Sequence, residues 1–420
     1  MKKLITFVLT FAILFSISTT YVYGADSIDL NNNSTDLKNF KNFSLYLKDG
    51  NLYAWGNNSY GQLGDSSYTN STTPKKIMDN VKAYNSGGNH SMAVKNDGTL
   101  WVWGSNSFAQ IGDGTYSNST SPKKIMDNVI AVSAGGNHSL ALKSDGTLWA
   151  WGSNAFAQIG DGTHINSTTP KKIMDNVTSI SAGANHSMAI KSDKTLWAWG
   201  SNSFAQIGDG TYSNSTTPKK IMDNVITISS GVSHSMAVKS DKTLWIWGSN
   251  SFAQIGDGTY TNSTSPKKIM NDVISISAGG NYSMAVKSDK KLWIWGSNAF
   301  AQIGDGTYTN STSPKNIMDN ILSINAGGSH SMATKTDGNL FVWGNNNYAQ
   351  IGDGTYINKT SPILISIGPV NTIPNNIENS NTTENNKSNE VYKPDNNAYI
   401  NKLSKINTYL LSLIFISTPF

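Results

Sequence analysis

Five histidines recur at multiples of 48 residues, and imidazole is both a common metal ligand and a common general acid or base. The column consists of His90, His138, His186, His234 and His330. Residues related by such a repeat lie in different structural units, so they share an ion only if they line a common axis. The column also contains Phe43 and Tyr282 in place of histidine. We therefore interpret these histidines as packing and hydrogen-bonding residues at the start of a strand, and we predict no metal site.

An aspartate in a Gly-Asp-Gly-Thr sequence repeats with the same period. The copies are Asp113, Asp161, Asp209, Asp257, Asp305 and Asp353. A calcium loop needs several oxygen ligands within one segment, whereas each copy here has a single acid. Because Asp followed by Gly is typical of turns, we interpret this column as turn residues.

Paired lysines form a third column, and a ring of repeats would spread them around its circumference. They are Lys75, Lys76, Lys123, Lys124, Lys171, Lys172, Lys219, Lys220, Lys267 and Lys268. Such a ring could bind an anionic envelope polymer or nucleic acid. Solvation of an exposed strand edge is the interpretation we favour. The chain contains no arginine, the residue that best recognises phosphate or guanine in a bidentate manner.

Tyrosines in a polar segment form the fourth column. They are Tyr68, Tyr116, Tyr212, Tyr260, Tyr308 and Tyr356, with His164 in the remaining copy. Exposed together, they would make a rigid amphipathic contact surface for a partner. Alternatively, each tyrosine folds down onto its own unit. The sequence favours neither arrangement, and these six tyrosines are our predicted partner-binding residues.

Catalytic motifs are missing from the sequence. It contains no Gly-x-Ser-x-Gly elbow, no phosphate-binding glycine loop before a helix and no His-Glu-x-x-His. We therefore predict a protein that is not an enzyme, with no catalytic residue and no cofactor.

A 48-residue unit must position all of these columns. A Trp-Gly pair marks it seven times, beginning at Trp55, Trp103, Trp151, Trp199, Trp247, Trp295 and Trp343. A period of this length indicates a solenoid or a propeller. Residues 129–176 contain about four short apolar runs bounded by Gly, Asn, Asp and Ser, which predicts four strands and no helix of ordinary length.

The run Leu100-Trp101-Val102-Trp103 is apolar on both faces, so both faces of its sheet must be covered by neighbours. We predict an all-β fold, a seven-bladed β-propeller built from seven 48-residue repeats. We also expect residues 26–40 to supply a missing strand to the sheet of the last unit.

The repeat resembles that of the regulator of chromosome condensation family. The matching pattern is His-Ser-x-Ala-x-Lys-x-Asp-Gly-x-Leu-x-x-Trp-Gly-x-Asn-x-x-x-Gln-Ile-Gly-Asp-Gly, as in residues 138–162. The resemblance covers about residues 34–368 and implies the propeller fold. The family's founding activity is nucleotide exchange on a small nuclear GTPase. No insertion interrupts the 48-residue period here and the chain begins like an exported protein, so we expect neither exchange activity nor a small GTPase partner.

The two ends of the chain differ from the repeats. Residues 1–24 read as a signal peptide, with Lys2 and Lys3 before an apolar run too short to span a membrane. We divide the remainder into an N-terminal linker (25–33), the propeller (34–370), a disordered Asn-rich linker (371–400) and a short apolar tail (401–420). The chain has no cysteine, so no disulfide stabilises it.

Together these features predict an exported bacterial protein, secreted or associated with the cell surface or envelope. We expect a monomer that binds an unidentified protein partner through loops at one end of the disc. One alternative is inhibition of an extracellular enzyme of the β-lactamase type, implied by a resemblance to the propeller-type β-lactamase inhibitory protein of the same repeat family. The other alternative is binding of an anionic surface polymer or nucleic acid by the lysine ring.

Overall fold

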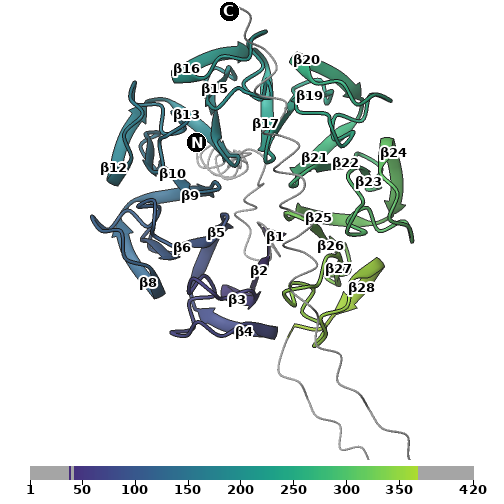
Figure 1. Ribbon diagram of the computed structural model, residues 1–420, viewed down its shortest axis with the longest axis horizontal. Helices are drawn as coiled ribbons and strands as arrows, with labels where there is room; N and C mark the ends of the chain where they lie inside the picture. The colour runs from purple at the N-terminus through teal and green to yellow at the C-terminus, as the bar shows by residue number, and fades with distance from the viewer. Residues whose placement is uncertain (1–36, 39–41, 368–420) are drawn as a thin grey trace, which may run out of the picture. The chain divides into compact units, whose positions relative to one another are not determined.

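Seven four-stranded antiparallel sheets stand around a central axis in the computed structural model, and each sheet forms one blade (Figure 1). The structure describes residues 37–38 and 42–367. The predicted signal peptide, the whole N-terminal linker, the Asn-rich linker and the apolar tail lie outside the described residues. The predicted all-β, seven-bladed propeller is confirmed.

The strands of each blade follow one another from the axis outward. The innermost strands are β1 (Leu37–Lys38), β5 (Val81–Ser86), β9 (Val129–Ala134), β13 (Val177–Ala182), β17 (Val225–Ser230), β21 (Val273–Ala278) and β25 (Ile321–Ala326). The second strands are β2 (Phe43–Lys48), β6 (His90–Lys95), β10 (His138–Lys143), β14 (His186–Lys191), β18 (His234–Lys239), β22 (Tyr282–Lys287) and β26 (His330–Lys335).

The third strands are β3 (Asn51–Gly56), β7 (Leu100–Gly104), β11 (Leu148–Gly152), β15 (Leu196–Gly200), β19 (Leu244–Gly248), β23 (Leu292–Gly296) and β27 (Leu340–Gly344). The outermost strands are β4 (Ser71–Met78), β8 (Ser119–Met126), β12 (Ser167–Met174), β16 (Ser215–Met222), β20 (Ser263–Met270), β24 (Ser311–Met318) and β28 (Lys359–Ile365).

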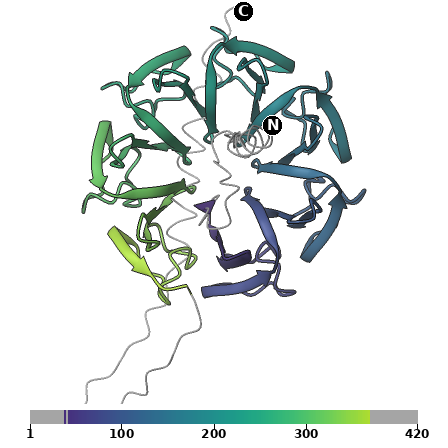
Figure 2. The same ribbon diagram turned by 180° about the vertical axis from the view of Figure 1, so that it is seen from behind.

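The core lies between the blades. One cluster joins Val102 and Leu100 of the second blade to Val132 and Trp151 of the third, and all four side chains are fully or almost fully buried. Each blade therefore covers its neighbour, which explains why the third strand is apolar on both faces. The view from behind shows the same radial arrangement of the blades around the ring (Figure 2).

The tight turns between second and third strands keep one conformation in the second to seventh blades, whereas in the first blade Asp49 and Gly50 form a two-residue turn in which both have a positive φ. Gly98 has a positive φ of 82°, and its N–H donates to the carbonyl of Lys95 at 2.9 Å. Where lysine replaces glycine, Lys194 has a φ of 63° and makes the same bond to Lys191. Lysine thus accepts a left-handed backbone at some conformational cost, and the turn type does not change.

Ring closure differs from our expectation. The segment containing β1 does supply a missing strand, but β1 pairs with β2 in the first blade and not with the sheet of the last unit. The last blade is complete by itself as β25 to β28. The first and last blades then meet as any other pair does, with Trp55 donating its indole N–H to the Gln350 carbonyl at 3.0 Å.

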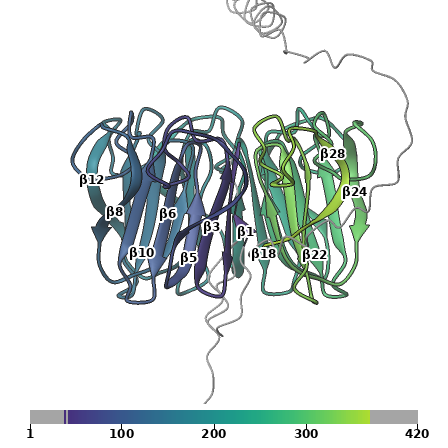
Figure 3. The ribbon, with the colours of Figure 1, turned by 90° about the horizontal axis from the view of Figure 1, so that it is seen from below.

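The two ends of the disc carry different loops. Long loops connect third to outermost strands at one end, whereas tight hairpins occupy the other (Figure 3). None of the described residues belongs to a helix long and apolar enough to cross a membrane.

Candidate functional site

Seven long loops at one end of the disc form what we call the loop face (Figure 3). Each loop runs from a third strand to an outermost strand and spans 14 residues by the strand bounds. They are residues 57–70, 105–118, 153–166, 201–214, 249–262, 297–310 and 345–358.

A buried asparagine organises each loop from inside. In the second blade, the Asn106 side chain accepts from the N–H of Ile111 and donates to the carbonyl of Thr115 at 2.9 Å. The backbone N–H of Asn106 donates to the Asn118 side chain at 2.8 Å. These bonds join both ends and the middle of the loop, so its outer side chains are presented on a fixed frame.

The repeated aspartate completes this frame, which confirms the turn interpretation. Asp113 accepts from the N–H and the hydroxyl of Thr115, and its second oxygen accepts from Lys123 at 2.6 Å. Burial by itself would raise the pKa of Asp113, but the hydrogen bonds from Lys123 and Thr115 and the charge of Lys123 lower that pKa below its ordinary value. The carboxylate is therefore ionised, and both of its oxygens already accept hydrogen bonds from Thr115 or Lys123.

The six predicted tyrosines all point into solvent. Their exposed fractions lie between 54% for Tyr212 and 57% for Tyr68. In the third blade the imidazole of His164 contacts the first half of its own loop. Whether the tyrosines contact a partner stays a prediction.

A second set of exposed aromatic side chains escaped the sequence analysis. It occupies the fifth position after each Trp of the Trp-Gly pair, as Tyr60, Phe108, Phe156, Phe204, Phe252, Phe300 and Tyr348. All except Phe300, which is half-buried, are among the exposed large apolar side chains. An aromatic residue two positions before a glutamine, repeated every 48 residues inside a polar loop, was the available signal.

The loop face is almost free of net charge. Each long loop contains one acid, and in every described copy that acid forms an ion pair of 2.5–2.7 Å with a lysine of its own blade. The other loop residues are mainly Asn, Ser, Thr, Gly, Gln and aromatic residues. The face therefore combines aromatic contact area with hydroxyl and amide groups.

The ten lysines of the predicted polyanion site are largely engaged with carboxylates. The first member of each pair contacts the loop aspartate, as Lys123 contacts Asp113. The second member contacts an acid three residues later in four blades, for example Lys124 with Asp127 at 2.7 Å. Because nine of the ten ammonium groups, all except that of Lys268, have an adjacent carboxylate, the pairs add little net positive charge to the rim.

The histidine column lies between blades and not in a pocket. Each of the five is fully buried, and burial lowers its pKa to about 3. His90 lies 3.0 Å from the Ser139 hydroxyl of the next blade, and that hydroxyl donates to the Gln110 carbonyl. Ser139 must therefore accept from a protonated His90 Nε2. This geometry agrees with the structural interpretation of the column.

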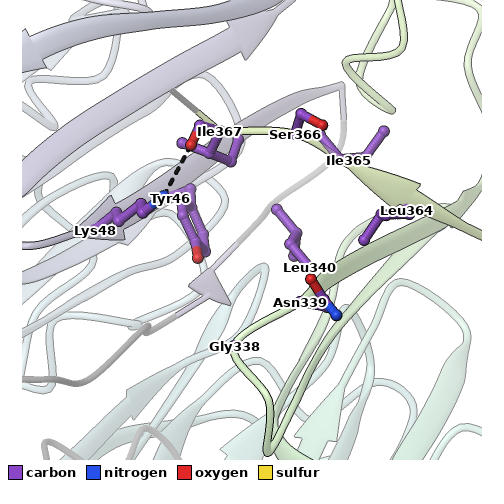
Figure 4. Close-up of a pocket in the computed structure, with 9 residues that line it drawn as sticks. All are labelled: Tyr46, Lys48, Gly338, Asn339, Leu340, Leu364, Ile365, Ser366 and Ile367. Atoms are coloured by element: carbon purple, nitrogen blue, oxygen red, sulfur yellow. Dashed lines mark hydrogen bonds between the residues drawn. The ribbon is translucent and has the colours of Figure 1, made fainter. Parts of the chain in front are cut away.

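A cavity of about 250 Å³ opens where the first and last blades meet (Figure 4). Tyr46, Lys48, Leu340, Leu364 and Ile367 contribute to its lining, and Lys48 donates to the Ile367 carbonyl at 2.9 Å. Burial, with the charge of Asp49, raises the pKa of Tyr46 to about 12. The lining contains one lysine, one tyrosine and no carboxylate.

Comparison with protein families gives a match over most of the chain. The family model of the RCC1-like domain matches residues 23–270 and 174–391, two overlapping stretches that together include all the described residues. No curated protein sequence matches the chain.

Several solved structures share the fold. Human WBSCR16 is 21% identical with a TM-score of 0.68, and the match covers 76% of this chain and 94% of that one. Prp20p of Saccharomyces cerevisiae, studied with its binding to Gsp1p and histones, is 22% identical with a TM-score of 0.68 over 83% of this chain and 88% of that one. Yeast RCC1 (Prp20), in its structure bound to Kap60, is 21% identical with a TM-score of 0.68, and the match covers 83% of this chain and 86% of that one. At these identities the likeness shows the shared architecture alone.

Proposed function

The chain belongs to the RCC1-like domain family, and from this premise we propose that it is a binding module that docks onto a protein partner through the loop face. Propellers of this kind host many unrelated functions, so the proposal depends on the face and not on the fold. Protein binding is also what the structures of the yeast relative concern. The proposal includes export, which rests on the charged start and apolar run of residues 1–24.

The observation that carries the proposal is the composition of the loop face. Exposed Tyr and Phe side chains alternate with Asn, Ser, Thr and Gly on a frame fixed by buried asparagines. Antibody loops use the same combination, because tyrosine supplies large contact area at low entropic cost while small polar residues supply hydrogen bonds. The single acid of each loop is already paired with a lysine, so little desolvation of free charge opposes docking.

Affinity capture with the full chain as bait tests the proposal. Extract and culture supernatant of the organism that encodes the chain are applied in low and moderate salt. The loop-face variant carries Tyr116, Tyr212, Tyr260 and Tyr308 changed to Ser, and the control variant carries Lys124, Lys172 and Lys220 changed to Gln. We expect a discrete protein that the wild type and the lysine variant retain in both salts and that the tyrosine variant releases.

Two other results would redirect the proposal. Capture of wall polymer or nucleic acid, lost in moderate salt and in the lysine variant, would favour the polyanion alternative, because phosphate contacts weaken steeply with salt. Retention of the same protein by the tyrosine variant would show that these tyrosines are not the contacts through which it binds.

Inhibition of an extracellular enzyme of the β-lactamase type remains the narrower form of this proposal. Its support is the exposed aromatic character of the loops. Titration of a β-lactamase with the purified chain would give a stoichiometric loss of hydrolysis if the inhibitor hypothesis is correct. We propose no exchange activity on a small GTPase, since the seven long loops all have the same length.

A further inference from the structure

Two of the seven long loops break the repeat at one exposed position. Directly after the tyrosine column, five loops carry Thr69, Ser117, Ser213, Thr261 and Thr309. The other two carry Ile165 and Ile357, which are 71% and 67% exposed. No other large apolar side chain among the described residues is as exposed as these two.

The fold does not require these isoleucines. The N–H of Ile165 donates to the Thr163 hydroxyl at 3.2 Å, and the N–H of Ser117 makes the same 3.2 Å bond to Thr115. The backbone at this position is therefore the same whether the side chain is polar or apolar. Neither isoleucine belongs to any of the interblade clusters. Their apolar surface is exposed to water and would gain free energy on burial against a partner.

The two isoleucines lie on opposite sides of the ring. Ile165 belongs to the loop between β11 and β12, and Ile357 belongs to the loop between β27 and β28. Three blades separate these loops in one direction and two in the other, and Figure 1 shows β12 and β28 across the axis from each other. Because both residues occupy the same place in equivalent loops, both protrude on the loop face.

We infer that Ile165 and Ile357 are the two anchor residues of the loop face, and that one protein partner spans the ring and buries both. The inference rests on the proposed function, since it names the partner's contacts on the same face. An aliphatic side chain has no hydrogen-bonding group, so it gains free energy on binding only when apolar surface of the partner removes it from water. The partner's contact surface is uncharged, because the acids of the loop face are already neutralised by lysines.

The chain supplies its own matched substitutions. Ile165→Ser and Ile357→Thr install residues that other loops carry at this position, so neither change should disturb folding. Thr261→Ser at the same position of the fifth blade is the control. The probe is the protein retained by the wild-type full chain, identified by mass spectrometry and purified. Titration calorimetry then gives its Kd and stoichiometry with each variant, and a thermal melt verifies that each variant is folded.

We expect a 1:1 complex in which each single substitution raises Kd by about tenfold, as loss of one buried aliphatic contact does. The double variant should raise Kd by about a hundredfold, since distant contacts to one partner add in free energy. The Thr261→Ser control should bind as the wild type does. Unchanged Kd in both single variants would overturn the inference, and so would two partners per propeller with one lost in each variant.

Failure of the inference and failure of the proposed function give different results. If the tyrosine variant loses binding while both isoleucine variants keep it, the loop face binds but these residues are not its anchors. If the tyrosine and isoleucine variants all bind normally, or if the wild type captures no protein, the proposed function fails and the inference fails with it.

Discussion

At the scale of single residues, the blades are joined by a repeated set of buried hydrogen bonds. His90 contacts Ser139 of the next blade, and both Ser139 and Trp151 donate to the carbonyl of Gln110, at 2.8 and 3.0 Å. The serine hydroxyl can donate only once, which fixes the proton on Nε2 of a neutral imidazole. Tyr282 replaces histidine in the sixth blade, where its hydroxyl donates to the carbonyl of His330. The histidines thus connect neighbouring blades.

Stability should fall as the pH decreases below the ordinary pKa of histidine. Each buried imidazole has a pKa of about 3 in the fold and 6.5 in its ordinary state, so between these values the unfolded chain binds more protons. Each of the five histidines should therefore lower the free energy of unfolding by about 1.4 kcal/mol for every pH unit below 6.5. Urea unfolding between pH 5.0 and 6.5 measures the slope.

His138→Tyr copies the residue that the sixth blade already carries and removes one titrating group. It should reduce that slope by about one fifth while the chain stays folded at pH 7.5. An unchanged slope in this variant would mean that the pH dependence arises elsewhere.

At the scale of the loop, glycine permits the approach of the next blade. Gly112 and Gly114 have the same φ of 83°, yet their surroundings differ. A Cβ on Gly112 would lie 2.5 Å from the indole nitrogen of Trp151, whereas a Cβ on Gly114 would meet nothing within 4 Å. Ser66 occupies the place of Gly114 in the first blade, with a φ of 63°. One glycine is thus needed for interblade contact and the other only for a left-handed backbone.

Gly112→Ala and Gly114→Ala should therefore differ in stability. Gly114→Ala should cost about 1 kcal/mol, the strain of a left-handed alanine. Gly112→Ala should cost at least about 3 kcal/mol, because it adds overpacking against Trp151 and displaces the indole from its hydrogen bond to Gln110. Chemical denaturation of the two variants measures the difference in their free energies of unfolding. Equal losses would show that backbone strain alone, without the contact to Trp151, accounts for the destabilisation.

At the scale of the whole molecule, the ring closes by packing between blades and not by a shared sheet. β1 pairs with β2 and also contacts the innermost strands β5 and β25 on either side. Ser44 and Trp55 of the first blade both donate to the Gln350 carbonyl of the last. The seam thus repeats the hydrogen bonds found between the other blades, with β1 as the innermost strand of the first.

Removal of residues 26–40 should lower the melting temperature by several degrees, because it takes away β1 and leaves the first blade with three strands. Deletion of residues 26–33, which precede β1, is the control and should leave the melt unchanged. Differential scanning calorimetry compares both with the full chain. A normal melt after removal of 26–40 would show that closure depends on the Trp55 and Ser44 contacts alone.

The sequence by itself determined the number of blades, the four strands of each and the structural place of the repeated histidines and aspartates. Those features depend on local periodicity, turn chemistry and the two-faced apolar third strand, all of which are written within one 48-residue unit. The loop tyrosines were also identified as candidates, although their exposure was not decided.

Only the tertiary structure decided features that depend on contacts between units. It placed β1 in the first blade, since strand pairing between distant segments leaves no local pattern. It showed that Tyr116 points into solvent and that Phe108 does also, because burial in an irregular loop is set by the frame around Asn106 and Asp113 and not by residue type. It also paired Lys123 with Asp113 across ten residues, which shows that the charges of the lysine column are compensated.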